Sequence, residues 1–112
     1  LMIDVRFLPN PYYDPELRPL TGLDEPVAQF VLEHGTTKKF LKSWFELLDV
    51  VMPGYVQEGK SLLSIAVGCT GGQHRSVAIA RATAEHLTSQ GYRVTLFHRD
   101  LDAAQKKSQQ AE

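Results

Sequence analysis

The sequence predicts an α/β fold: a small three-layer domain with a short, mainly parallel sheet. Two apolar stretches, at residues 2–8 and 61–68, are rich in β-branched residues and have the length of strands. Stretches with helical spacing of apolar residues separate them and follow them. Strands that alternate with helices favour parallel pairing through right-handed crossovers.

The first predicted strand, residues 2–8, runs into a segment that contains Pro9, Pro11 and Pro15. Prolines lack a backbone donor and fix φ, so residues 9–22 are expected to form a loop. Asp24 is a suitable cap for a helix with Pro26 in its first turn. This helix should end near Gly35 and present an apolar face made of Val27, Phe30 and Val31.

A longer helix should begin at a cap formed by Thr36 or Thr37 and should close or kink at Pro53-Gly54. Its buried stripe is predicted to contain Phe40, Leu41, Trp44, Phe45, Leu47, Leu48 and Val51.

The strand at 61–68 is almost continuously apolar, which predicts a central strand buried on both faces. A helix over residues 74–90 follows and ends at Gly91, and residues 92–98 are expected to form a third strand. We interpret residues 1–112 as a single domain with a polar tail from 99 to 112.

Composition narrows the possible functions. The 112 residues carry a net charge of −1, with 43% hydrophobic and 22% charged residues. These values are ordinary for a soluble globular domain and argue against a wholly basic nucleic-acid binder. No apolar run has the length of a membrane span, and a signal peptide is not visible. The single cysteine excludes an internal disulfide, and a cytoplasmic location without membrane association is expected.

The most informative segment is the predicted loop between the second strand and the helix at 74–90. It contains Gly71 and Gly72, which let the backbone fold closely around a ligand, and Arg75, whose planar guanidinium fits phosphate. Free N–H groups at a helix N-terminus also favour an anion. The loop therefore predicts a phosphate site. The lysine spacing of a Walker A motif is absent, which argues against a nucleoside triphosphate site here.

Other interpretations of this loop remain open. Cys69 and Arg75 are separated by five residues and followed by Ser76, as in the phosphate loop of cysteine-dependent phosphatases. Cys69 could equally be a small core residue, the glycines a tight turn, and His74 a helix-start residue. No histidines or carboxylates have metal-ligand spacing, so neither a metal nor a cofactor is predicted.

Two segments together resemble a known family. The first is Asp4-Val5-Arg6-Phe7-Leu8-Pro9-Asn10-Pro11 with Asp14-Pro15, Leu17-Arg18 and Thr21-Gly22. The second is Gly68-Cys69-Thr70-Gly71-Gly72 with His74-Arg75-Ser76-Val77, and His98-Arg99 follows near the end. In order and distance these match the C-terminal domain of the RapZ (YvcJ) proteins over nearly all of the chain.

The resemblance implies a noncatalytic regulatory domain. Full family members also carry an N-terminal P-loop nucleotide-binding domain, which is not among these residues. In enterobacterial members the C-terminal domain senses glucosamine-6-phosphate, binds small regulatory RNA as an adapter for ribonuclease E, and self-associates. The expected partners are therefore a sugar phosphate or another phosphorylated small molecule, a small RNA with its ribonuclease, and further copies of the chain in a homo-oligomer.

The resemblance also implies site residues. A sugar phosphate would be held by Thr70, Gly71, Gly72, His74, Arg75 and Ser76, and we add Cys69, Asn10 and Tyr12 to the predicted ligand-binding residues. Tyr12 stands where some members have a ligand-binding histidine. The residues predicted for RNA contact are His98, Arg99, Lys106 and Lys107. No catalytic residue is assigned. The alternatives are a phosphatase that uses Cys69 and Arg75, and an oligomerisation domain without a specific ligand.

Overall fold

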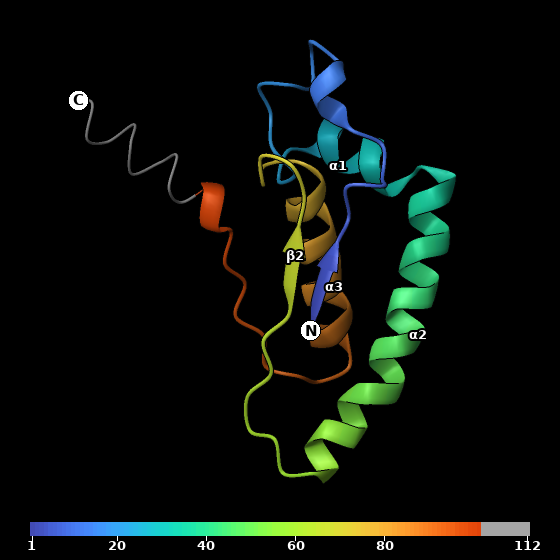
Figure 1. Cartoon of the computed structure of the whole chain (residues 1–112), viewed down its shortest axis with the longest axis vertical. Coiled ribbons are helices and arrows are strands. Elements are labelled where there is room, and N and C mark those ends of the chain that lie inside the picture. The colour runs from blue at the N-terminus through green and yellow to red at the C-terminus, as the bar shows by residue number, and fades with distance from the viewer. Residues whose placement is uncertain (102–112) are drawn as a thin grey trace, which may run out of the picture.

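The computed structural model describes residues 1–101, and the tail from 102 onwards lies outside the described residues. In order along the chain, the elements are β1 (Met2–Asp4), the short 3₁₀ helix η1 (Pro11–Tyr13), α1 (Glu25–Leu32), α2 (Gly35–Gln57), β2 (Ala66–Gly68) and α3 (Arg75–Ser89). Figure 1 shows the two strands side by side, with the long helix α2 along one edge of the molecule.

The sheet is short and parallel. Within the described residues β1 pairs with β2, and Ile3 lies opposite Val67 in the register. The crossover between the strands contains η1, α1 and α2, and α3 then packs against β2. The predicted α/β class is confirmed, and the arrangement is compatible with a small three-layer domain. Because both strands run in the same direction, the loops that follow them meet at one end of the sheet.

Two apolar clusters hold these elements together. The first joins the end of β1, α1 and α3, and its buried members are Val5, Leu8, Val27, Val31, Ala78 and Ile79. The second joins α2 to α3 through Trp44, Leu48, Met52 and Leu87. At this contact the indole Nε1 of Trp44 donates a 3.1 Å hydrogen bond to the buried hydroxyl of Thr83. The clusters fix the start of α3 relative to the ends of both strands.

Several strand predictions were wrong. β1 ends at Asp4 rather than at residue 8, because the Asp4 carboxylate accepts the Arg6 N–H and turns the chain. β2 covers only Ala66–Gly68, and its residues are exposed or half-buried, unlike those of a central strand. Residues 92–98 are extended but form no ladder with the described residues, because a groove separates them from β2.

The helices follow the prediction more closely, since α1 and α3 lie within one to three residues of the expected bounds. α2 differs at both ends. Its cap is His34, whose Nδ1 accepts the Thr36 N–H, rather than Thr36 or Thr37. Pro53 lies inside the helix, which continues to Gln57. Phe30 of α1 and Leu47 of α2 are exposed, although both were predicted to lie on buried faces. The elements that pack against these two helices cover a narrower stripe of each helix than predicted.

Candidate anion-binding site at the start of α3

The loop between β2 and α3 depends on two glycines. Gly71 and Gly72 have φ values of +83° and +66°, in the left-handed region that side-chain-bearing residues avoid. Their consecutive left-handed turns reverse the chain within a few residues and lead directly into Arg75, the first residue of α3. These angles fit a tight turn at both positions.

The turn leaves a set of backbone donors open. The N–H groups of residues 70–75 donate no hydrogen bond to any described residue. The next one, that of Ser76, donates to the Sγ of half-buried Cys69 at 3.3 Å. Thr70, Gly71 and Gln73 are exposed, and free donors at a helix N-terminus attract anions. The loop therefore presents several donors together with the positive end of the α3 dipole.

One side of this loop is joined to the segment that follows β1. The Gln73 carbonyl accepts the Gly22 N–H at 2.8 Å, and Nε2 of His74 lies 3.1 Å from the Arg18 carbonyl. Gly22 packs so closely that a β-carbon there would lie 2.5 Å from the His74 carbonyl oxygen and 2.6 Å from the Ala78 nitrogen. Two segments more than 50 residues apart in the sequence thus meet backbone to backbone, as the shared edge of the sheet predicts.

Arg75 also belongs to this contact between the loop and the segment after β1, which we call the joint. Its Nη1 donates to the carbonyl oxygens of Arg6 at 2.5 Å and of Leu8 at 3.2 Å, and the residue is 4% exposed. Ser76, equally buried, follows it at the start of α3. The sequence predicts that the planar guanidinium of Arg75 binds phosphate. In the structure this guanidinium is directed at the chain after β1 instead. It contributes positive charge close to the loop while it holds two backbone carbonyls in place.

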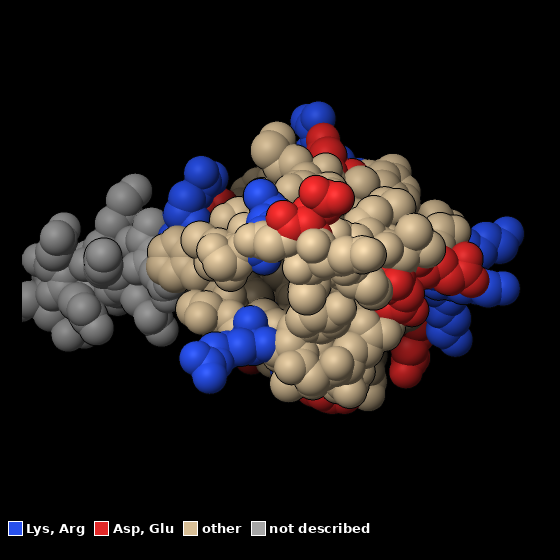
Figure 2. All heavy atoms as spheres, turned by 90° about the horizontal axis from the view of Figure 1, so that it is seen from below, with Lys and Arg blue, Asp and Glu red and all other residues tan. Residues whose placement is uncertain are grey.

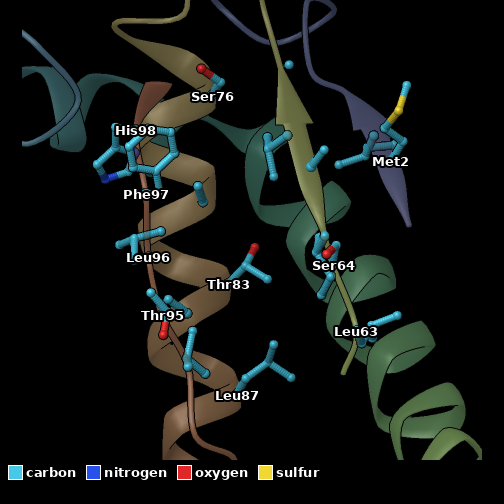
Figure 3. A pocket seen from close by; sticks show the side chains of 18 of the residues that line it. Met2, Leu63, Ser64, Ser76, Thr83, Leu87, Thr95, Leu96, Phe97 and His98 are labelled. Atoms are coloured by element: carbon cyan, nitrogen blue, oxygen red, sulfur yellow. The ribbon is translucent and has the colours of Figure 1, made fainter. Parts of the chain in front are cut away.

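The other side of the loop faces a groove of about 1450 Å³. Figure 3 shows α3 and residues 95–98 on one side of this space and the strand side, with Met2 and Leu63, on the other. Most of the groove is apolar. Polar and small groups gather where it reaches the loop, and they are Asp4, Arg6, Cys69, Thr70, Gly72, Ser76, Arg99 and Asp100.

Arg6 is a candidate site residue that the sequence interpretation missed. Its guanidinium lies at the groove, is largely exposed, and forms an ion pair with Asp4 through Nε and Nη2, each at 2.8 Å from Oδ2. Hydrogen bonds from the Arg6 backbone and side chain lower the pKa of Asp4, and burial opposes them only partly. The assumed strand to residue 8 hid this role, because a strand that ends at Asp4 places Arg6 in the loop at the sheet edge.

Asn10 and Tyr12 lie away from the groove. The Asn10 side chain accepts the Tyr12 N–H and caps η1. The Tyr12 ring is about half exposed and stacks under the Arg18 guanidinium, 4.6 Å from the ring centroid. The structure thus brings residues 69–76 together with the loop of Asn10 and Tyr12, but neither of these two side chains lines the groove.

The residues predicted for RNA contact are only partly described. His98 is half-buried, Arg99 is highly exposed, and Lys106 and Lys107 lie outside the described residues. On the face shown in Figure 2, Lys and Arg side chains alternate with Asp and Glu rather than forming one basic strip. Across residues 1–101 the structure holds no cluster of three potential metal ligands, and no helix there is long and apolar enough to cross a membrane.

The family is established by comparison with known proteins. The RapZ C-terminal domain family matches residues 1–102, and the chain belongs to this family. The chain is 54% identical over 101 residues to a nucleotide-binding protein of Desulforudis audaxviator, which covers 90% of the chain and 34% of the relative. Similar matches are the nucleotide-binding proteins of Carboxydothermus hydrogenoformans, at 55% over 91% of the chain and 35% of the relative, and Lactiplantibacillus plantarum, at 53% over 91% and 34%. The chain thus spans about a third of the length of these relatives.

Proposed function

We propose that this domain is a noncatalytic regulatory module that binds a phosphorylated small molecule, an amino-sugar phosphate such as glucosamine-6-phosphate, at the loop before α3. The observation that carries the proposal is the set of open N–H groups at residues 70–75, which surround the positive end of the α3 dipole. Membership of the RapZ C-terminal domain family supports the same ligand class.

The charged groups at the loop support an anionic ligand. Arg6 and Arg99 are exposed arginines at the groove, ion-paired with Asp4 and Asp100, and buried Arg75 adds a further positive charge behind the loop. The open amides, the hydroxyls of Thr70 and Ser76, and Arg6 supply donors for the phosphate oxygens. The adjoining groove has room for the sugar ring. In this arrangement His74 and Arg75 shape the loop, and the amides and Arg6 contact the ligand.

The phosphatase alternative needs an arginine that grips the phosphate opposite the cysteine. In the structure, Nη1 of Arg75 instead donates to the carbonyl oxygens of Arg6 and Leu8. The noncatalytic proposal predicts that neither the wild type nor Cys69→Ser hydrolyses an aryl phosphate, measured as phenolate release at matched concentrations. Cys69→Ser should also bind glucosamine-6-phosphate nearly as the wild type does. Turnover in the wild type that disappears in Cys69→Ser would establish the phosphatase.

The relatives are named nucleotide-binding proteins, and these 112 residues contain no Walker A motif. We therefore assign nucleotide binding to the parts of the relatives that this chain does not match. The proposed role of this domain is to report the level of a metabolite. In that role, binding to the folded state raises its apparent stability.

The test of metabolite binding is a titration with glucosamine-6-phosphate, followed by thermal unfolding and by isothermal calorimetry. We expect the midpoint temperature of unfolding to rise with ligand concentration. Arg6→Gln should weaken the affinity for glucosamine-6-phosphate about tenfold, which corresponds to the lower end of the contribution of one charge-assisted hydrogen bond. Arg81→Gln, which removes an exposed arginine of α3 outside the groove, is the matched control and should bind as the wild type does. No response of the wild type at millimolar ligand would refute the proposal.

The proposed regulatory role extends to small RNA as an RNase adapter, with the exposed Arg99 and the lysines of the tail as contacts. Phosphate contacts release counterions, so RNA affinity should fall steeply as salt rises. Lys106→Ala with Lys107→Ala should lower both the affinity and the salt slope, whereas Lys38→Ala with Lys39→Ala on α2 should change neither. Binding that is insensitive to salt, or absent in dilute buffer, would remove RNA from the proposal.

A further inference from the structure

The edge of β2 that faces away from β1 has no partner strand among the described residues. The Ala66 N–H donates to the Leu1 carbonyl at 2.8 Å, so Ala66 directs its backbone groups at the β1 side. Backbone groups alternate in direction along a strand, and those of Ile65 and Val67 therefore point to the opposite edge, toward the groove. Neither of these two N–H groups donates to a described residue.

A second extended segment borders the same groove. Residues 92–98 run in the same direction as β2, as Figure 1 shows, and the N–H groups of residues 93–97 donate no hydrogen bond within the described part of the chain. Leu63 from one side and Val94 from the other pack against the same apolar cluster of α2 and α3. The groove thus has an unpaired backbone edge on each side and an apolar floor.

The open edges favour a peptide as the occupant of the groove. Exposed strand edges pair readily with another extended chain, and an added strand satisfies their unpaired groups. Ala80 and Ala84 of α3 line the groove, and their small side chains leave room for the apolar side chains of such a strand. A lipid chain would fill the same apolar space, but it would leave the N–H groups of both edges without a partner.

The charges of the groove add a second requirement. Four of the charged residues that line it are paired with one another, and they are Asp4, Arg6, Arg99 and Asp100. The other two, Lys60 and Arg93, are exposed and form no ion pair with a described residue. Both lie where the extended segments begin, at the end of the molecule that Figure 2 views. Glu58, the acid nearest to Lys60 in the sequence, does not line the groove. This end therefore attracts an acidic group.

We infer that the groove between β2 and residues 92–98 is a docking site for an extended peptide segment of a partner protein, which adds a strand between the two edges. The segment carries apolar side chains at alternate positions, facing α3, and an acidic residue or a carboxyl terminus beside Lys60 and Arg93. This site lies along the groove away from the loop before α3, and it does not depend on the proposed phosphate ligand.

The test uses a peptide of about six residues, the usual length of a strand, with fluorescein at its amino end. Valine alternates with threonine in this peptide, and the last residue is a glutamate with a free carboxyl group. Fluorescence anisotropy should show saturable binding to the wild type. Methylation of the internal amide nitrogens keeps the side chains but removes the donors, and should weaken binding at least about tenfold. In the complex, hydrogen exchange measured by NMR should slow at the N–H groups of Ile65 and Val67.

The charge requirement is tested with Lys60→Gln combined with Arg93→Gln. This variant should bind the acidic peptide about fivefold more weakly, as expected for exposed ion pairs, and should bind a peptide that ends in glutamine amide as the wild type does. The matched control is Lys42→Gln combined with Arg81→Gln, which removes two exposed cations outside the groove and should leave both affinities unchanged. Thermal unfolding checks that both variants are folded.

Three results would overturn the inference. Equal binding of the methylated and unmethylated peptides, with displacement of both by dodecanoate, would show an apolar groove that does not pair with a strand. Exchange at Ile65 and Val67 that slows with rising protein concentration in the absence of peptide would show that a second copy of the chain takes the groove. Absence of saturable binding at millimolar peptide would exclude the docking site. None of these results bears on the phosphate site, which is tested separately with glucosamine-6-phosphate.

Discussion

The two sides of the loop at the start of α3 differ in what their polar groups contact. On one side, Gln73, His74 and Arg75 are joined to the segment after β1 through backbone carbonyls and the Gly22 N–H. On the other side, Thr70, Gly71 and Gly72 leave their N–H groups open beside a groove. One short stretch of sequence thus serves as a structural joint and as a candidate binding surface.

In this loop, the residue types that usually bind ligands hold the structure together instead. Arginine and histidine are the residues that sequence interpretation assigns to a ligand first, yet here both are buried and hold carbonyl groups. A buried guanidinium remains stable only when its donors are satisfied, so its burial and its partners arise together. The groups left for a ligand are backbone amides and an exposed arginine from another segment, Arg6.

The largest effect is expected at the joint. Arg75→Met removes both bonds from Nη1 and leaves the carbonyls of Arg6 and Leu8 without a donor. Charged hydrogen bonds contribute about 1.5–3 kcal/mol each, so the free energy of unfolding should fall by roughly 3 kcal/mol in urea denaturation. Arg81→Met on the exposed side of α3 should change it by less than about 0.5 kcal/mol. Equal stability of Arg75→Met and wild type would end the distinction between the two sides.

Gly22→Ala tests the same joint without a change in charge. The added β-carbon would collide with the backbone at His74 and Ala78, and overpacking of this kind costs about 1–3 kcal/mol. We expect a corresponding fall in the denaturation midpoint. Gly35→Ala is the control, because a β-carbon at the first residue of α2 meets nothing within 4 Å. A Gly22→Ala variant as stable as Gly35→Ala would show that the two segments are not held together this closely.

Gly71→Ala should affect the open side and barely the joint. A β-carbon at position 71 meets no atom within 4 Å, but its φ of +83° costs a side-chain-bearing residue about 1–2 kcal/mol. Relaxation of that angle would turn the neighbouring N–H groups away from the groove. We expect weaker binding of glucosamine-6-phosphate, measured by calorimetry, in a protein that still unfolds cooperatively. Unchanged affinity would argue that the amides are not the phosphate donors.

The smallest expected effect concerns the pH dependence of stability. The pKa of Asp4 is lowered in the folded state, chiefly by hydrogen bonds from Arg6, so the folded protein favours the charged carboxylate. Its contribution is present above the unfolded pKa and is lost as the pH falls through the folded value, below about pH 4. Asp4→Asn should therefore lower the stability slightly at neutral pH, leave it nearly unchanged at the lowest pH, and so flatten the acid limb of the stability curve. A steeper acid limb would contradict this sign.

The helices and the nature of the loop could be predicted from the sequence alone. Local signals carry this information: the spacing of apolar residues in α1 and α3, the prolines, and the paired glycines of the loop, which have positive φ values in the structure. The parallel sheet also followed from the alternation of strands and helices. Each of these features depends on residues close together in the chain.

The extent of the strands and the direction of the charged side chains depend on contacts between distant parts of the chain. Residues 92–98 have the composition of a strand, but a strand also needs a partner with free hydrogen-bonding groups, and a groove lies between them and β2. Arg75 turned to carbonyls 67 and 69 residues away, and Asp100 reached Gly72 from the other end of the domain. Sequence patterns determine local conformation, whereas contacts across the chain depend on how the folded elements pack, and these contacts divide the loop into a joint and an open surface.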